Sequence, residues 1–184
     1  MNERLLDAQQ VRESADCLHD AAAVQRAYDR LAAQIEREYA GKNPLLLCVM
    51  IGGLQPTAEI VQRLAFPFEL DYLHATRYRG QTSGADLHWK AHPDIAVAGR
   101  DVLVIDDILD EGHTLAAILF ALRGQNAASV KCAVLCEKLH ARKAPDVRAD
   151  FVGLTVEDRY VFGCGMDYKS YWRQLPGIYA VKES

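Results

Sequence analysis

Three carboxylates stand close together at the end of a strongly apolar segment. Asp106 and Asp107 follow the run Val-Leu-Val-Ile at 102–105, and Asp110 comes three residues later. Crowded carboxylates repel one another, so they usually need a cation, hydroxyl donors or an N–H group to satisfy them. Residues 111–114, Glu-Gly-His-Thr, then open a predicted helix, whose N-terminal amides bind phosphate well. This arrangement indicates a sugar phosphate, with its hydroxyls on the acids and its phosphate on the amides. Taken alone, the acids could also be solvated loop residues, with Asp110 as a helix cap.

The surrounding pattern predicts an α/β fold with a mostly parallel sheet. Continuous apolar runs are typical of strands buried on both faces, and apolar residues at three-and-four spacing are typical of amphipathic helices. Strands are expected at 45–50, 68–73, 102–105 and 130–136, with short strand-like pieces at 151–154 and 160–162. Helices are expected at 21–40, 56–64 and 114–122. Ligands bind outside the carboxyl ends of such strands, where the three acids stand.

Composition narrows the class of protein. The chain has 184 residues, half of them hydrophobic, and a net charge of -4, which suits one domain over 1–184. An acidic balance without a basic face argues against nucleic-acid binding. No apolar run approaches a membrane span, the N-terminus lacks a signal-peptide core, and no cysteines are spaced as Cys-x-x-Cys. A cytoplasmic protein with reduced thiols is expected.

Residues 76–92 hold glycines, polar groups and few core residues. A segment of this kind is expected to be a mobile loop or ribbon that acts as a lid, with a passive hairpin as the alternative. His74, His88 and His92 invite a zinc interpretation, but no partner cysteines accompany them.

The segment 102–115 resembles the phosphoribosyl-pyrophosphate (PRPP) motif of type I phosphoribosyltransferases. The resemblance extends to the hypoxanthine-guanine members from about residue 17 to 180. It implies a twisted, mostly parallel sheet flanked by helices, with a small hood built from N-terminal residues and about 150–184. It also implies a Mg²⁺-dependent purine-salvage transferase that forms IMP or GMP and pyrophosphate from hypoxanthine or guanine and PRPP, through an oxocarbenium-like transition state.

The resemblance also implies a role for each matching residue. Asp110 corresponds to the aspartate near purine N7, the general base. The PRPP site comprises Asp106, Asp107, Asp110, Glu111, Gly112, His113 and Thr114. Pyrophosphate is assigned to Ile51, Gly52, Gly53 and Arg173, the lid to Arg77 and Tyr78, the purine to Lys138, Tyr160, Val161 and Asp167, and the metal to Asp106, Asp107 and Asp167. Alone, Lys138 would be taken for a surface charge and Tyr160 for core packing, and only their order and spacing favour a site.

Several residues depart from the family pattern. Asp106 stands where glutamate is more frequent, Ile51 where lysine is frequent, and Arg77 where serine is usual. Glu111 replaces a common threonine and would repel phosphate, so its side chain is expected to point outward while its backbone N–H binds. His113 stands where lysine or glycine is common.

Two other functions remain open at this stage. A xanthine-preferring transferase would share the aspartate at position 110. A non-catalytic regulator that senses nucleotide and binds nucleic acid would keep the acidic motif but needs a basic face. By analogy with the family, a homo-oligomer, either a dimer or a tetramer, is expected.

Overall fold

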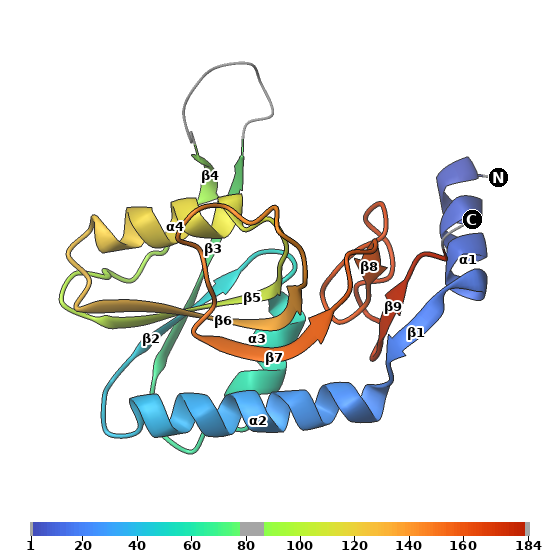
Figure 1. The fold of residues 1–184 in the computed structure, drawn as a ribbon. Coiled ribbons are helices and arrows are strands. Elements are labelled where there is room, and N and C mark those ends of the chain that lie inside the picture. Colours follow the sequence, from blue (N-terminus) through green and yellow to red (C-terminus); the bar gives the residue numbers. More distant parts are fainter. Residues whose placement is uncertain (1, 78–86, 183–184) are drawn as a thin grey trace.

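The computed structural model describes residues 2–77 and 87–182, and its main element is a six-stranded sheet (Figure 1). The strand order is β4-β3-β2-β5-β6-β7. All neighbours pair parallel except β3 and β4, which are antiparallel. The strands are β2 (Leu45–Val49), β3 (Glu69–Arg77), β4 (Leu87–Ala91), β5 (Asp101–Leu109), β6 (Ser129–Lys138) and β7 (Phe151–Val156). The predicted α/β class is therefore confirmed.

Helices cover both faces of this sheet because its central strands are apolar on both sides. In β5, Leu103 and Ile105 pack in the cluster that includes α2 (Ala21–Tyr39), whereas Val102 and Val104 pack in the cluster that includes α4 (His113–Arg123). Figure 1 shows α2 and α4 on opposite sides of the sheet. The helix α3 (Leu54–Val61) begins two residues earlier than predicted and packs beside α2.

The strand β5 does not end at the acidic pair, which corrects the sequence-based expectation. Its ladder with β6 continues through Asp106, opposite Val134, to Ile108 and Leu109. The backbone N–H and C=O groups of an aspartate can pair in a ladder like those of other residues, so the two carboxylates do not end the strand. The acids are therefore held by a central strand rather than by a loop.

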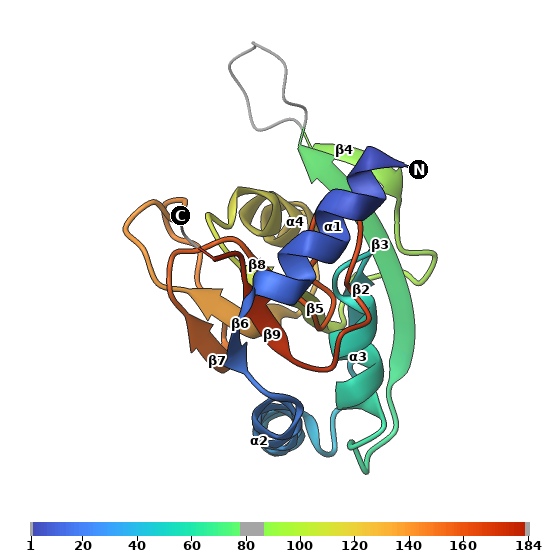
Figure 2. The same ribbon diagram turned by 90° about the vertical axis from the view of Figure 1, so that its right-hand side faces the viewer.

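A second, three-stranded sheet has the order β1-β9-β8 and joins the two ends of the chain. It consists of β1 (Asp16–His19), β8 (Val161–Phe162) and β9 (Ile178–Ala180), all antiparallel. The helix α1 (Glu3–Ser14) packs on the same part of the molecule (Figure 2). Its Ala8 packs with Phe162 and Tyr168, and the Ala8 carbonyl accepts a 2.7 Å hydrogen bond from Trp172 Nε1.

Four of the five cysteines are buried, and all five are free thiols. Among the described residues, no helix combines the length and apolar character that crossing a membrane requires.

Candidate active site

The acidic pair lies at the carboxyl end of β5 and is electrostatically strained. The N–H of Asp107 donates to Asp106 Oδ1 at 2.9 Å, and the N–H of Ile108 donates to Asp107 Oδ1 at 2.7 Å. Burial raises the pKa of both carboxyls, and the charge of Asp107 raises that of Asp106 further. The positive charge of Arg173 opposes these shifts without cancelling them. Further positive charge or hydroxyl donors from a ligand would stabilise the ionised pair.

The turn after β2 touches this pair directly. The Met50–Ile51 peptide bond is cis, and the N–H of Gly53 donates to Val49 O at 2.8 Å. A Cβ atom at Gly52 would overlap the Asp107 carboxylate, and one at Gly165 would overlap the carbonyl of Gly52. Only glycine allows these backbones to approach so closely, so three distant segments meet at Asp107.

The predicted phosphate turn forms the start of α4. Gly112 has a φ of +76°, and a Cβ atom there would lie 2.6 Å from Leu109 Cδ1 and 2.8 Å from Val147 Cγ1. The N–H of Ala116 makes a helical bond to Gly112 O at 2.8 Å, and the N–H groups ahead of it belong to the first turn, which has no intrahelical acceptors. This end of α4 therefore presents amides of residues 112–115, with His113 exposed and Thr114 half-buried.

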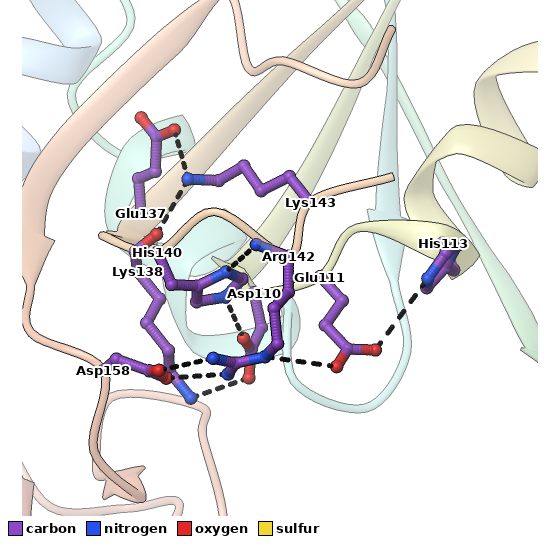
Figure 3. Close-up of polar contacts among 9 residues, drawn as sticks. All are labelled: Asp110, Glu111, His113, Glu137, Lys138, His140, Arg142, Lys143 and Asp158. Carbon is purple, nitrogen blue, oxygen red and sulfur yellow. Dashed lines mark hydrogen bonds and ion pairs between the residues drawn. The ribbon is translucent and has the colours of Figure 1, made fainter. Parts of the chain in front are cut away.

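The side chain of Glu111 extends into solvent beside this turn. It is 54% exposed, and its carboxylate lies 3.9 Å from both Arg142 Nε and His113 Nε2 (Figure 3). Its orientation agrees with the expectation drawn from its charge.

A cavity of about 260 Å³ lies beside the acids. It brings together the acid end of β5, the end of β6 and the segment around β8. Its lining residues are Asp107, Ile108, Asp110, Lys138, Tyr160, Val161, Met166 and Asp167. All four residues predicted to contact a purine therefore line one cavity, together with Asp110, the predicted general base.

Asp110 is already held by two donors (Figure 3). Lys138 Nζ donates to Oδ2 at 2.7 Å, and His140 Nε2 lies 2.7 Å from Oδ1. Partial burial opposes ionisation of Asp110, but these two bonds outweigh it and lower its pKa below the ordinary value. His140 was missed in the sequence, where a histidine two residues after a lysine in a charged turn carries no distinctive pattern.

Arg173 and Asp167 pair with each other at the cavity edge. Arg173 Nη2 lies 2.5 Å from Asp167 Oδ1, and its Nη1 donates to Gly165 O at 2.6 Å. Asp167 Oδ2 also accepts from the N–H of Ser170 at 2.6 Å. Arg173 thus closes the loop that rests on Gly52.

The predicted three-carboxylate metal site of Asp106, Asp107 and Asp167 is not preformed. Within residues 2–77 and 87–182, no three His, Cys, Asp or Glu side chains converge in a way that could hold a metal. In this structure the Asp167 carboxylate is paired with Arg173, so its assignment to a metal stays a prediction.

The predicted lid is described only at its two sides. The strand β3 runs to Arg77 and pairs with β4, so residues 76–77 and 87–91 form an antiparallel ribbon. Tyr78 lies outside the described residues.

Comparison with known proteins supplies the family. The family model for the phosphoribosyl transferase domain matches residues 14–170. The chain belongs to the phosphoribosyltransferase family. A hypoxanthine-guanine-xanthine phosphoribosyltransferase of Tritrichomonas foetus is 35% identical over 167 residues, covering 91% of each chain. A hypoxanthine-guanine phosphoribosyltransferase of Bacillus subtilis (strain 168) is 35% identical over 160 residues, covering 86% of this chain and 88% of its own.

Solved structures agree with the observed phosphoribosyltransferase fold. A hypoxanthine-guanine-xanthine phosphoribosyltransferase superposes with a TM-score of 0.83 at 33% identity, covering 91% of this chain and 97% of its own. A hypoxanthine phosphoribosyltransferase of Staphylococcus aureus superposes with a TM-score of 0.86 at 27% identity, covering 99% and 96%. The predicted type I phosphoribosyltransferase fold is confirmed.

Proposed function

We propose that this phosphoribosyltransferase joins hypoxanthine or guanine to the ribose phosphate of PRPP, forming IMP or GMP and pyrophosphate. The observation that carries the proposal is the pairing of Asp110 with Lys138 inside the cavity, 2.7 Å apart. An ammonium can only donate, so it favours a purine oxygen over an amino group, while the neighbouring carboxylate accepts a ring N–H. These two groups match a 6-oxopurine and disfavour adenine.

The neighbouring features give each part of PRPP a place in the proposal. The 5′-phosphate would bind the turn formed by Asp110, Glu111, Gly112, His113 and Thr114. The ribose hydroxyls would bind Asp106 and Asp107. The pyrophosphate would lie on the turn Ile51, Gly52 and Gly53, with Arg173 beyond it. Support comes from the close packing of that turn on Asp107.

In the transfer of the phosphoribosyl group, the bond between C1′ and pyrophosphate would loosen first. The bond's electrons leave with pyrophosphate, purine N9 forms the new bond to C1′, and the ring proton passes to Asp110 Oδ2. Lys138 would leave that oxygen for the purine O6. Tyr160, which is 52% exposed at the cavity, would stack on the base, and Val161 would offer backbone contacts. The lid role assigned to Arg77 and Tyr78 stays a prediction, since Tyr78 lies outside the described residues.

Mg²⁺ fits this site as a cation bound together with the substrate. Magnesium is usually held by one or two carboxylates plus substrate phosphates and waters. The raised pKa values of Asp106 and Asp107 indicate a pair that gains from added positive charge. The ion would neutralise charge on the leaving pyrophosphate, and Asp167 could join only if Arg173 released it.

Further parts of the proposal rest on the family resemblance. We propose that residues 1–184 form a single domain in which the sheet β1-β9-β8 and α1 are the hood. We also propose a cytoplasmic homo-oligomer, either a dimer or a tetramer, that acts on small molecules rather than on nucleic acid or membranes.

The test is nucleotide formation from PRPP and Mg²⁺ with hypoxanthine, guanine, xanthine and adenine offered separately. Turnover of hypoxanthine and guanine, with adenine inert, is the expected result. The xanthine rate matters because two of the compared proteins carry xanthine in their names. Tight nucleotide binding without turnover of any base would contradict the proposal and favour a regulator.

A further inference from the structure

His140 contacts Asp110 from outside the cavity. It lies in the segment 139–148 that follows β6, and only 3% of its side chain is exposed. Its Nε2 lies 2.7 Å from Asp110 Oδ1, yet His140 is not among the residues that line the cavity. The imidazole therefore reaches the proposed base on the side away from the purine.

The bonds of the imidazole define which nitrogen carries the proton. The backbone N–H of Arg142 points to Nδ1 at 3.1 Å. A backbone N–H can only donate, so Nδ1 must be the acceptor and the ring proton must lie on Nε2. His140 thus donates to Asp110, as Lys138 does on the other carboxylate oxygen.

The segment that carries His140 is fixed by further bonds (Figure 3). Lys143 Nζ donates to Lys138 O at 2.8 Å and lies 3.0 Å from Glu137 Oε1. Arg142 binds both carboxylate oxygens of Asp158, at 2.7 and 3.0 Å. These contacts tie the segment to β6 and to the turn after β7, so the ring has a defined place beside Asp110.

We infer that His140 is a positioning residue that holds Asp110 in place when purine draws Lys138 away. The inference rests on the proposed function, in which Lys138 moves from Oδ2 to the purine oxygen. Oδ2 is then free to take the ring proton, while His140 still holds Oδ1. The two donors of Asp110 thus have different tasks, since one changes partner and the other stays.

None of the charged groups named below would hold the Asp110 carboxylate in place of His140 once Lys138 binds the purine. Lys138 faces it from β6, Arg142 from segment 139–148 and Asp107 from β5 across the cavity. Arg142 is bound to Asp158 and only adds a distant positive charge. Without His140, the carboxylate would lose its remaining bound donor once purine arrived, and it would ionise less readily.

The test compares two amide substitutions, His140→Gln and His140→Asn. The Gln nitrogen can stand near the place of Nε2 and donate to Asp110, whereas the shorter Asn side chain cannot reach it. For H140N we expect kcat to fall about tenfold or more, the effect of losing a hydrogen bond to a charged group, with an unchanged KM for PRPP. The acidic limb of its kcat profile should move about one unit to higher pH, because a carboxylate without its donor protonates more readily.

The kcat profile should respond more than the profile of kcat/KM, which reports the enzyme before purine binds, when Lys138 still holds Asp110. H140Q should keep most of the kcat and the original acidic limb. Leu139→Ala, in the same segment with a side chain that is 58% exposed, is the control and should match the wild type.

Several outcomes would overturn the role of His140. One is an H140N variant with the wild-type kcat and acidic limb. Equal impairment of H140N and H140Q would also do so, as would loss of PRPP binding by H140N in calorimetry, which would mark a merely structural role. A wild-type protein that turns over no oxopurine would instead contradict the proposed function, before any variant is compared.

Discussion

The acidic pair Asp106–Asp107 and the single carboxylate of Asp110 lie within five residues of chain, yet their surroundings are opposite. Burial raises the pKa values of both carboxyls, the charge of Asp107 raises that of Asp106 further, and Arg173 only partly compensates. Asp110 has two bound donors, Lys138 and His140, and its pKa is lowered. The pair is incomplete without a ligand, whereas Asp110 is ionised and oriented before any ligand arrives.

In the proposed function, the acidic pair and Asp110 would contribute to different steps. A site with unbalanced negative charge gains from binding a cation and hydroxyl donors, so its contribution belongs to PRPP affinity. The Asp110 carboxylate already has two hydrogen-bond donors, so it can exchange one of them for a purine ring N–H at little cost in free energy. Its contribution would therefore be to the chemical step. Measuring PRPP affinity and turnover separately in substituted proteins would test this division.

The largest effect is expected for Asp110→Asn. An amide cannot take the ring proton, and losing a positioned acid–base group typically lowers kcat by about 10²–10⁴-fold. PRPP binding, measured by calorimetry, should change little because the acidic pair and the backbone amides of the phosphate turn stay in place. An unchanged kcat would contradict the assignment of Asp110 as the base.

A smaller and opposite pattern is expected for Asp106→Asn and Asp107→Asn. PRPP affinity in the presence of Mg²⁺ should fall about 10- to 100-fold, since a hydrogen bond to a charged group contributes about 1.5–3 kcal/mol. Calorimetry of PRPP binding would measure this loss. Glu13→Gln removes an exposed charge from α1 and is the control that should leave it unchanged.

In the absence of ligand, both of these variants should be more stable than the wild-type protein. Carboxyls whose pKa is raised by folding stabilise the fold at low pH and lose that contribution as pH rises through the folded pKa. Removing one charge should therefore raise Tm at neutral pH by about 2–4 °C for each kcal/mol relieved. The pH dependence is opposite for Asp110. Because folding lowers its pKa, its carboxylate stabilises the fold above the unfolded pKa, and this stabilisation is lost as pH falls through the folded pKa. A lower Tm for both pair variants would contradict the comparison.

The smallest effect is expected for Glu111→Thr. The exposed carboxylate lies next to the phosphate turn and weakly repels an anion there, so its removal should lower the KM for PRPP about twofold. The difference should shrink as salt is added, because exposed charges are screened. Steady-state kinetics at low and high salt would measure it, and a raised KM would mean that Glu111 takes part in binding.

Much of this architecture could be predicted from the sequence because its signals are local. The apolar runs of β2 and β5 and the stripe of α2, capped by Asp20 through its bond to the N–H of Ala23, indicate buried elements directly. The helix α1 gave no such signal, since Ala8 is its only fully buried residue and it has no apolar stripe. The end of β5 was also misjudged, because strand pairing depends on a neighbouring strand and not on the acids themselves.

The candidate site also contains features that could be predicted from the sequence and features that could not. The family resemblance assigned the motif residues and also brought Lys138, Tyr160, Val161 and Asp167 to the cavity of Asp110. Individual side-chain contacts between distant segments could not be predicted. The bond between His140 and Asp110 depends on segment 139–148 folding back, where the N–H of Ala144 donates to Glu111 O at 2.7 Å. The ion pair that occupies Asp167 depends likewise on the loop that brings Arg173 to it.

The bond from Trp172 to the carbonyl of Ala8 has an optical consequence. The chain contains two tryptophans, and this one precedes Arg173 directly. The other, Trp89, lies in β4 and stacks on His92. In a Trp89→Phe variant, all tryptophan fluorescence, excited selectively over that of the tyrosines, would come from the indole beside Arg173. If Arg173 binds pyrophosphate as proposed, a change in emission from that single fluorophore would report pyrophosphate binding and release without a label.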